Sequence, residues 1–265
     1  MLRCPVCREP IQKTNDKTYV CPNRHSFDIS KKGYVNFLLC QNMRSKLPGD
    51  NKDMVEAREQ FLSKGYYFSF LRELKNIIDQ YQPTDILDAG CGEGYYTSGV
   101  YSTDRNIIGI DISKSALQKA APKNRDITYI AASLFDLPMK DNSVELLFSL
   151  FAPYAGEEFY RVLKKDGIMI LGIPGADHLF ELKSVIYETP YKNQVKEYEL
   201  EHFTFLEARK IHKKIKLQNK NDILNLFQMT PYYYRTRKED LEKIHSLEQF
   251  EVTISFELLV YQKQS

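Results

Sequence analysis

Short runs of apolar residues recur along the chain from about residue 85 onward, and stretches with helical spacing separate most of them. Such runs are typical of strands that helices cover on both faces of a parallel sheet. The pattern therefore predicts an α/β fold with a mostly parallel sheet. The strands expected here cover residues 86–88, 107–110, 127–131, 145–150 and 168–173.

The last apolar stretch has a different period. Every second residue from Phe250 to Val260 is apolar, which predicts a terminal strand that enters the sheet antiparallel to its neighbours. Before the first parallel strand, helical spacing predicts one helix that begins near Asp53, capped by Asp50 or Asn51, and another that ends before Pro83. A further helix is expected over residues 221–228.

A glycine-rich turn follows the first of the parallel strands. Asp88 ends the apolar run, and Gly90, Gly92 and Gly94 alternate after it. Glycines let backbone N–H groups approach a ligand closely, and open α/β sheets bind ligands at this end of their strands. The spacing is G-x-G-x-G, not the G-x-G-x-x-G of dinucleotide sites. Asp111 closes the second strand, where a carboxylate can accept hydrogen bonds from both hydroxyls of a ribose.

Three of the five cysteines lie within the first 21 residues and share a pattern with His25. Cys4, Cys7, Cys21 and His25 have the spacing C-x2-C-x13-C-x3-H, in which two pairs of ligands suit tetrahedral Zn²⁺. A closed set of four ligands leaves no position for substrate, so the zinc is expected to be structural. Residues 11–20 between the pairs can form a hairpin. We expect a zinc-binding module at 1–36, a linker with helices at 37–82, and a catalytic domain at 83–265.

Charge and composition narrow the possible partners. The chain carries 37 Lys and Arg against 35 Asp and Glu, so any nucleic acid must be bound by a local patch. The cations of 209–216 are interrupted by Ile211 and Ile215 and followed by Leu217, so this segment can bury one side and face phosphate, or can be a plain solvated strand or helix. No apolar run is long enough to span a bilayer, and the N-terminus lacks a secretion signal. With the metal-type cysteine spacing, this indicates the cytoplasm and no membrane partner.

The D-x-G-C-G-x-G turn is similar to motif I of class I S-adenosylmethionine-dependent methyltransferases, whose sheet is Rossmann-like. Together with the zinc pairs, it makes the chain resemble the bacterial RlmA-type 23S rRNA guanine-N1 methyltransferases over nearly its whole length. The other stretches that carry the resemblance include Gly33-Tyr34-Val35-Asn36, Pro48-Gly49-Asp50, Ala57-Arg58, Gly65-Tyr66-Tyr67, Ala152-Pro153, Pro174-Gly175 and Gln228-Met229-Thr230-Pro231.

The resemblance implies roles for particular residues. Zinc would be bound by Cys4, Cys7, Cys21 and His25. S-adenosylmethionine would be bound by Tyr67, Gly92, Glu93 and His178, in addition to the motif residues Asp88, Gly90 and Asp111. The family methylates N1 of a guanine in a hairpin loop of domain II of 23S rRNA, and members from Gram-positive bacteria can contribute to resistance against tylosin-like macrolides. A homodimer with a basic cleft is also implied.

No residue stands out as a catalytic base; Asp177 and His178 are candidates by position only. Ala152 stands where enzymes that methylate exocyclic amines carry Asn or Asp, which disfavours that reaction. Two other functions stay open at this point. One is a small-molecule methyltransferase with a structural zinc module, and the other is a non-catalytic RNA-binding zinc-ribbon protein.

Overall fold

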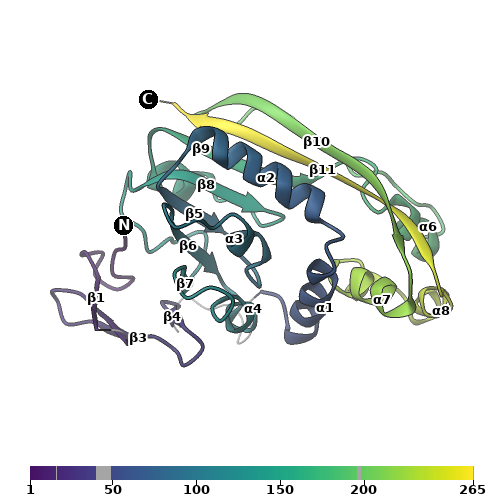
Figure 1. Cartoon of the computed structure of the whole chain (residues 1–265), viewed down its shortest axis with the longest axis horizontal. Coiled ribbons are helices and arrows are strands. Elements are labelled where there is room, and N and C mark those ends of the chain that lie inside the picture. Colours follow the sequence, from purple (N-terminus) through teal and green to yellow (C-terminus); the bar gives the residue numbers. More distant parts are fainter. Residues whose placement is uncertain (16, 40–48, 196–197, 265) are drawn as a thin grey trace.

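An eight-stranded mixed sheet forms the centre of the molecule in a computed structural model, which describes residues 1–15, 17–39, 49–195 and 198–264 (Figure 1). The strand order is β10-β11-β9-β8-β5-β6-β7-β4. The strands are β4 Tyr34–Asn36, β5 Asp85–Ala89, β6 Asn106–Asp111, β7 Thr128–Ala131, β8 Val144–Leu150, β9 Leu163–Pro174, β10 Phe203–Leu217 and β11 Phe250–Lys263. The five predicted parallel strands are confirmed as β5 to β9, and β11 is antiparallel to both of its neighbours.

Helices cover both faces of this sheet and bury two apolar cores. One core lies under α2, whose residues Phe70, Leu74 and Ile77 are fully buried, and the other includes Phe159 of α5. The side chain of Asn51 caps α1 by accepting a hydrogen bond from the N–H of Met54. The helices are α1 Lys52–Ser63, α2 Phe68–Tyr81, α3 Tyr95–Gly99, α4 Lys114–Ala120, α5 Gly156–Val162, α6 Phe180–Ile186, α7 Lys220–Gln228 and α8 Lys238–His245.

The N-terminal part forms a separate small sheet at one end of the molecule (Figure 1). Its antiparallel strands are β1 Gln12–Asn15, β2 Thr18–Val20 and β3 Ser26–Asp28, so the hairpin predicted between the cysteine pairs is confirmed. The chain then enters the main sheet, because β4 pairs in parallel with β7 at its edge. Sequence reasoning did not identify this strand, which has only three residues.

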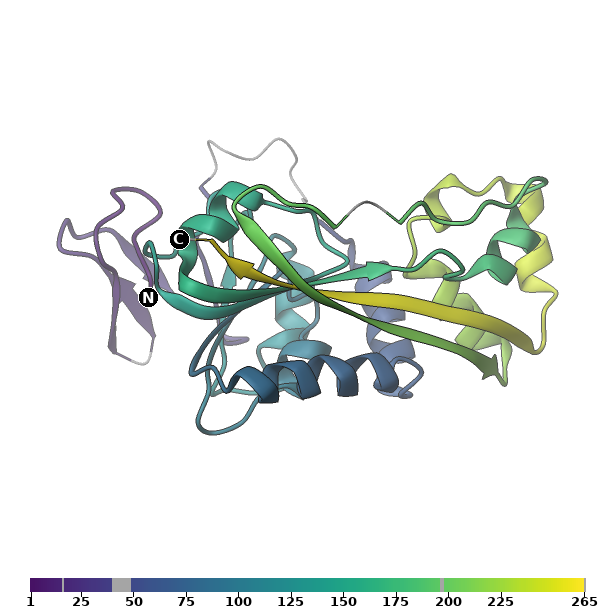
Figure 2. The ribbon, with the colours of Figure 1, turned by 90° about the horizontal axis from the view of Figure 1, so that it is seen from above.

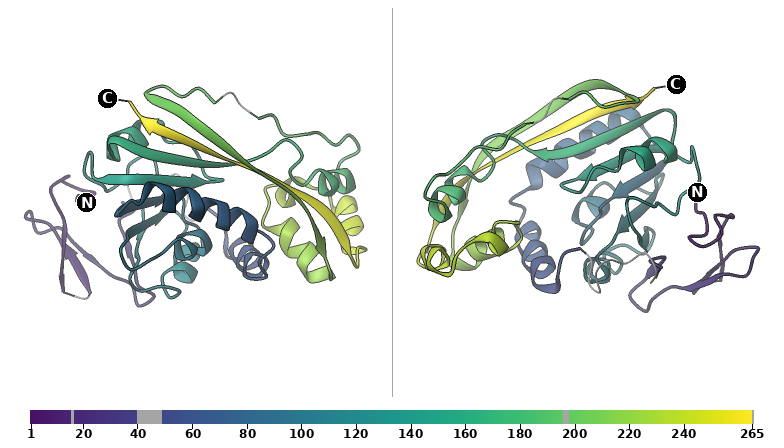
Figure 3. Two further views of the ribbon diagram at one scale, coloured as in Figure 1. Left: turned by 45° about the horizontal axis from the view of Figure 1, so that its top comes forward. Right: turned by 180° about the vertical axis from the view of Figure 1, so that it is seen from behind.

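At the opposite edge, β10 and β11 form a long antiparallel ribbon that extends past the parallel strands toward α6, α7 and α8 (Figures 2 and 3). The basic segment at 209–216, for which both strand and helix were open, lies in β10 and is therefore a strand. Ile215 and Leu217 are buried on the face that packs on the α2 and α7 side, while Lys214 and Lys216 are exposed.

The start of one strand differs from the sequence-based expectation. Strand β9 begins at Leu163, not at 168, and residues 164–167 bulge out between the pairs Val144–Leu163 and Leu146–Ile168. Asp166 in this bulge has a positive φ of 60°. The helix after the glycine turn is short, since α3 covers five residues. No helix within the described part of the chain is long and apolar enough to cross a membrane.

Candidate functional site

The glycine turn between β5 and α3 depends on backbone conformations that favour glycine. Gly90, Gly92 and Gly94 have φ values of 95°, 53° and 81°. A Cβ at Gly90 would lie 2.6 Å from Cβ of Ala152, and one at Gly94 would lie 2.8 Å from Cβ of Ala120. A Cβ at Gly92 would have no neighbour within 4 Å. Gly90 and Gly94 are therefore required for packing, whereas Gly92 leaves free space beside the turn.

Backbone donors fix the carboxylate at the end of β6. The N–H groups of Gly92 and Ser113 donate to the two oxygens of Asp111, at N···O distances of 2.8 and 2.7 Å. Burial raises the pKa of Asp111, and these two hydrogen bonds act in the opposite direction. The carboxylate thus links the glycine turn to the start of α4 and keeps lone pairs for a further donor.

Asp88 lies at the end of β5 and is 1% exposed. Its carboxyl group accepts a hydrogen bond of 2.6 Å from the hydroxyl of Thr97 on α3. Burial raises the pKa of Asp88 to about 8, and the Thr97 hydrogen bond opposes this effect. A cation that enters beside Asp88 would stabilise its charged form.

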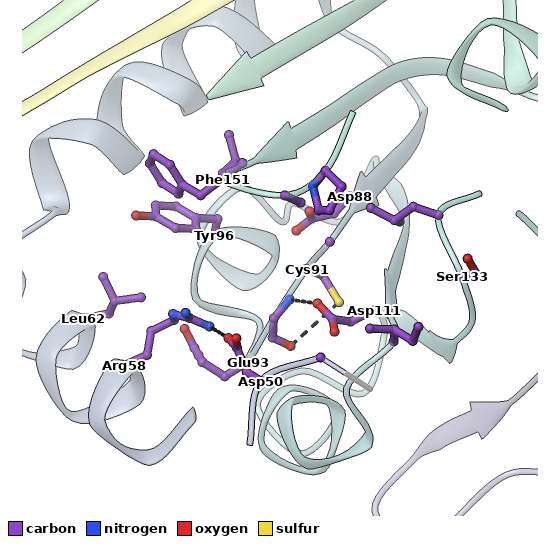
Figure 4. A pocket seen from close by; sticks show the side chains of 18 of the residues that line it. Asp50, Arg58, Leu62, Asp88, Cys91, Glu93, Tyr96, Asp111, Ser133 and Phe151 are labelled. Carbon is purple, nitrogen blue, oxygen red and sulfur yellow. Dashed lines mark hydrogen bonds and ion pairs between the residues drawn. The ribbon is translucent and has the colours of Figure 1, made fainter. Parts of the chain in front are cut away.

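A cavity of about 440 Å³ opens at the glycine turn, and we call it the glycine cavity. Figure 4 shows Asp88, Asp111 and Ser133 on one side of it and Arg58 on the other. Five of the seven residues predicted to bind cofactor line it: Asp88, Gly90, Gly92, Glu93 and Asp111. Glu93 is 3% exposed and pairs with Lys123, so its carboxylate already has a cationic partner.

The two remaining predicted residues, Tyr67 and His178, line an adjoining cavity of about 440 Å³. We call this second space the aromatic cavity, because Tyr67, Tyr96, Phe151, Tyr232 and Phe256 contribute to its wall. The two cavities share part of their lining: Arg58, Leu62, Tyr96, Phe151 and Ala152. The structure thus brings all seven residues to one region but divides them between two adjacent spaces.

His178 and Asp177 are in different environments. The ring of His178 lies 4.4 Å from that of Phe256, and its Nδ1 accepts a hydrogen bond of 3.3 Å from the N–H of Ser255. Burial lowers the pKa of His178 to about 3, so its imidazole is neutral near pH 7. Asp177 lines neither the glycine nor the aromatic cavity and pairs with Lys192 at 2.8 Å. Neither environment favours the action of a general base.

Sequence reasoning missed residues that line both cavities. Arg58, Tyr96 and Phe151 come from three separate elements, and none of them was proposed as a site residue. Only Arg58 gave a signal, since it is a cation within the otherwise apolar stripe of helix α1.

The four predicted zinc ligands converge in the N-terminal part. One donor atom from each of Cys4, Cys7, Cys21 and His25 lies within 4.8 Å of all the others. The Sγ atoms of Cys7 and Cys21 are 3.7 Å apart, and Nδ1 of His25 is 3.6 Å from Sγ of Cys4. Tetrahedral zinc with metal–sulfur bonds of about 2.3 Å separates its ligand atoms by about 3.5–3.8 Å. The donor set and its geometry therefore fit a structural zinc ion.

Comparison with known proteins agrees with this two-part arrangement. Residues 2–46 match a family model described as RlmA, N-terminal, a zinc ribbon, and residues 87–171 match a model described as a methyltransferase domain. The YcgJ protein of Bacillus subtilis has a similar crystal structure, with a TM-score of 0.55 at 15% identity, over 73% of this chain and 99% of that one. At this identity the likeness shows the fold alone.

Two relatives extend the similarity beyond the fold. A candidate 23S rRNA (guanine-N(1)-)-methyltransferase of Micromonospora griseorubida is 35% identical over 68% of this chain and 68% of its own length. The candidate enzyme YxjB of Bacillus subtilis, which has the same activity in its name, is 28% identical over 99% of this chain and 97% of its own. The chain belongs to the RlmA-type family of 23S rRNA (guanine-N1-)-methyltransferases.

Proposed function

We propose that this protein transfers a methyl group from S-adenosylmethionine to N1 of a guanine in a hairpin loop of domain II of 23S rRNA. The observation that carries the proposal is the contact between the two cavities through the shared residues Tyr96, Phe151 and Ala152. One cavity offers the glycine turn and Asp111 to a nucleoside, and the other offers aromatic rings to a base. The two cavities adjoin at these shared residues, where a donor in one cavity and an acceptor in the other can meet.

The residues of the glycine cavity fit the methyl donor. The free space at Gly92 admits the ligand against the backbone, and Asp111 can accept hydrogen bonds from the ribose hydroxyls. Ile112 and Leu134 supply apolar surface next to Asp111, on which an adenine ring can pack. When bound, S-adenosylmethionine supplies an electrophilic methyl group. Tyr67 and His178 would then contact only the end of the ligand that reaches the aromatic cavity.

The aromatic cavity suits a base that has left its helix or loop. N1 of guanine lies on the Watson–Crick edge, so the base must be extruded before N1 can approach the donor. Phe151 and Tyr232 offer ring surfaces for stacking, and Ala152 offers no side-chain acceptor for an exocyclic amine. This combination favours attack by a ring nitrogen.

The N1 proton must leave before or during the attack. The imidazole of His178 is a weak base because burial lowers its pKa to about 3, and Asp177 lies outside both cavities. We therefore propose that the protein accelerates the reaction mainly by alignment of donor and acceptor, with the proton lost to solvent. The rate should then rise with pH until N1 itself is deprotonated.

We propose that the zinc ribbon binds the rRNA near the target loop. We also propose that the enzyme acts as a homodimer and that the methylation contributes to resistance against tylosin-like macrolides. Light scattering on the purified protein tests the dimer. Growth of strains with and without the gene on tylosin tests the resistance.

The central experiment is primer extension on a domain II hairpin transcript after incubation with the protein and S-adenosylmethionine. N1 methylation blocks Watson–Crick pairing, so reverse transcriptase should stop one nucleotide before the modified guanine. A transcript with adenine at that position serves as the control. If no stop forms, and methyl transfer occurs to a small molecule without RNA, the protein is instead a small-molecule methyltransferase. RNA binding without affinity for the methyl donor would indicate a non-catalytic RNA-binding protein.

A further inference from the structure

Arg58 is a cationic residue that lines both cavities. Within the described residues, it is the one Lys or Arg in the lining of either cavity. By contrast, four carboxylates line the glycine cavity: Asp50, Asp88, Glu93 and Asp111. Among these lining side chains, Arg58 is therefore the one that can attract an anionic group of a ligand.

Arg58 is fixed in its place by contacts on two sides. Its Nη1 pairs with the carboxylate of Asp50, which precedes α1, and its Nη2 donates at 3.3 Å to the carbonyl oxygen of Met229 (Figure 4 shows the Asp50 pair). A guanidinium group has five N–H donors, so these two contacts leave others for a ligand. The side chain is 26% exposed, and it lines both cavities. These two contacts thus fix the guanidinium at the boundary of the two cavities.

Two buried hydroxyl groups close to Arg58 have no partner. The hydroxyl oxygens of Tyr67 and Tyr96 are both buried, and neither forms a hydrogen bond with any described residue. Burial raises the pKa of both hydroxyls, so each keeps its proton and can donate it, while the charge of Arg58 acts in the opposite direction on both. Buried hydroxyls normally form hydrogen bonds, so two that lack a partner indicate that a ligand supplies one.

On this basis, and resting on the proposed function, we infer that Arg58, Tyr67 and Tyr96 bind the α-carboxylate of the methionine end of S-adenosylmethionine. The planar guanidinium matches a carboxylate in charge and geometry, and the two hydroxyls can donate to its remaining lone pairs. Asp111 at the ribose and Arg58 at the carboxylate would then hold the donor at two points. The sulfonium group would lie between them, next to the wall formed by Phe151 and Ala152.

This assignment also accounts for the position of Tyr67. The family resemblance predicts that Tyr67 contacts the donor, yet it lines the aromatic cavity and not the glycine cavity. A carboxylate beside Arg58 lies at the boundary of the two, where the Tyr67 hydroxyl can reach it. Asp50 becomes a positioning residue, because it acts on the ligand through Arg58.

The test compares two ligands that differ only in the carboxylate. S-adenosylhomocysteine carries it, and S-adenosyl-3-thiopropylamine lacks it; both are titrated by calorimetry into the full chain without RNA. The wild type should bind the first ligand roughly 30-fold more tightly, as expected for charge-assisted hydrogen bonds. In Arg58→Met the two ligands should bind almost equally, and Arg58→Lys should restore part of the preference. Arg72→Gln, at an exposed position of α2 outside both cavities, should leave it unchanged.

Loss of the preference in Arg58→Met supports the assignment. If the affinity of Arg58→Met for both ligands falls by the same factor, the preference stays intact. Arg58 then has only a structural role, and the assignment is overturned. Tyr67→Phe and Tyr96→Phe remove single oxygen atoms and should each lower the preference several-fold. If Arg58→Met does not fold, the ligand preference of these two variants tests the assignment instead. If the wild type binds neither ligand, the proposed function fails as well, which separates the two conclusions.

Discussion

Gly92 and Gly94 offer a matched pair of substitutions that separates the role of the glycine turn in folding from its role in binding. Both have a positive φ, so alanine at either position adopts a strained backbone. They differ in what a new methyl group would meet. At Gly92 nothing lies within 4 Å, whereas at Gly94 the methyl would lie 2.8 Å from Cβ of Ala120 and 2.9 Å from the hydroxyl of Tyr129.

The expected costs follow from these distances. Gly92→Ala should lower the free energy of unfolding by about 1 kcal/mol, since it introduces backbone strain and no clash. Gly94→Ala has the same strain and also an overpacking cost of about 1–3 kcal/mol, because the nearby Cα of Ala120 at 3.1 Å prevents easy relaxation. Its total should be about 2–4 kcal/mol. Of these two residues only Gly92 lines the glycine cavity, so its methyl should occupy space that the ligand needs.

Urea unfolding without ligand measures the first effect, and calorimetry with S-adenosylhomocysteine measures the second. Gly92→Ala should stay within about 1 kcal/mol of wild type in stability while its affinity falls at least tenfold. Gly94→Ala, if it folds, should show the larger loss of stability of the two variants, about 2–4 kcal/mol. The reasoning is refuted if Gly92→Ala binds the ligand as tightly as wild type, because the open space at this residue would then not be the ligand site.

Three further predictions test other parts of the site. In His178→Gln, urea titrations should show a smaller loss of stability on acidification than in wild type, by about 2 kcal/mol between pH 7 and pH 5. The reason is that the unfolded chain binds a proton below pH 6.5, while burial holds the native pKa near 3; equal losses would contradict it. Asp111→Asn should lower stability by about 1–3 kcal/mol and abolish ligand binding in calorimetry, because an amide N–H would oppose the N–H of Gly92 or Ser113; unchanged affinity would exclude a ribose contact. Metal analysis should find one zinc per chain, which Cys7→Ser should lose together with thermal stability, and a metal-free wild type would contradict the zinc site.

Features that depend on neighbours in sequence could be predicted from the sequence. The cysteine pairs and the glycine turn are short patterns whose geometry is fixed locally. The positions of Asp88 and Asp111 could also be predicted, because parallel strands carry their carboxyl ends to one edge of the sheet. The register of β5 and β6 places these two residues two positions out of alignment, because Asp88 lies opposite Gly109.

Features made by distant segments could not be predicted in this way. The aromatic cavity combines Tyr67 at the start of α2, Phe151 after β8 and Phe256 of β11, and no periodicity relates these positions. Strand β4 has three residues, too few to show alternation, and its pairing with β7 defines it as part of the main sheet. The spacing of Ile211, Ile215 and Leu217 among the cations of β10 is compatible with a helix or a strand, and only the hydrogen-bonded pairing with β11 defines it as a strand.

The zinc ribbon is joined to the methyltransferase sheet more closely than its motif suggests. Leu2, Tyr19 and Phe37 belong to the same apolar core as strand residues of the main sheet. The ring of Phe37 lies 6.0 Å from that of Tyr19, and Leu2 forms a β-bridge to Met139 in the segment between β7 and β8. Earlier residues of that segment line the glycine cavity. Cys4 and Cys21, two of the four predicted zinc ligands, are buried in this same core. We therefore expect loss of the metal to weaken the packing between the ribbon and the segment that lines the glycine cavity.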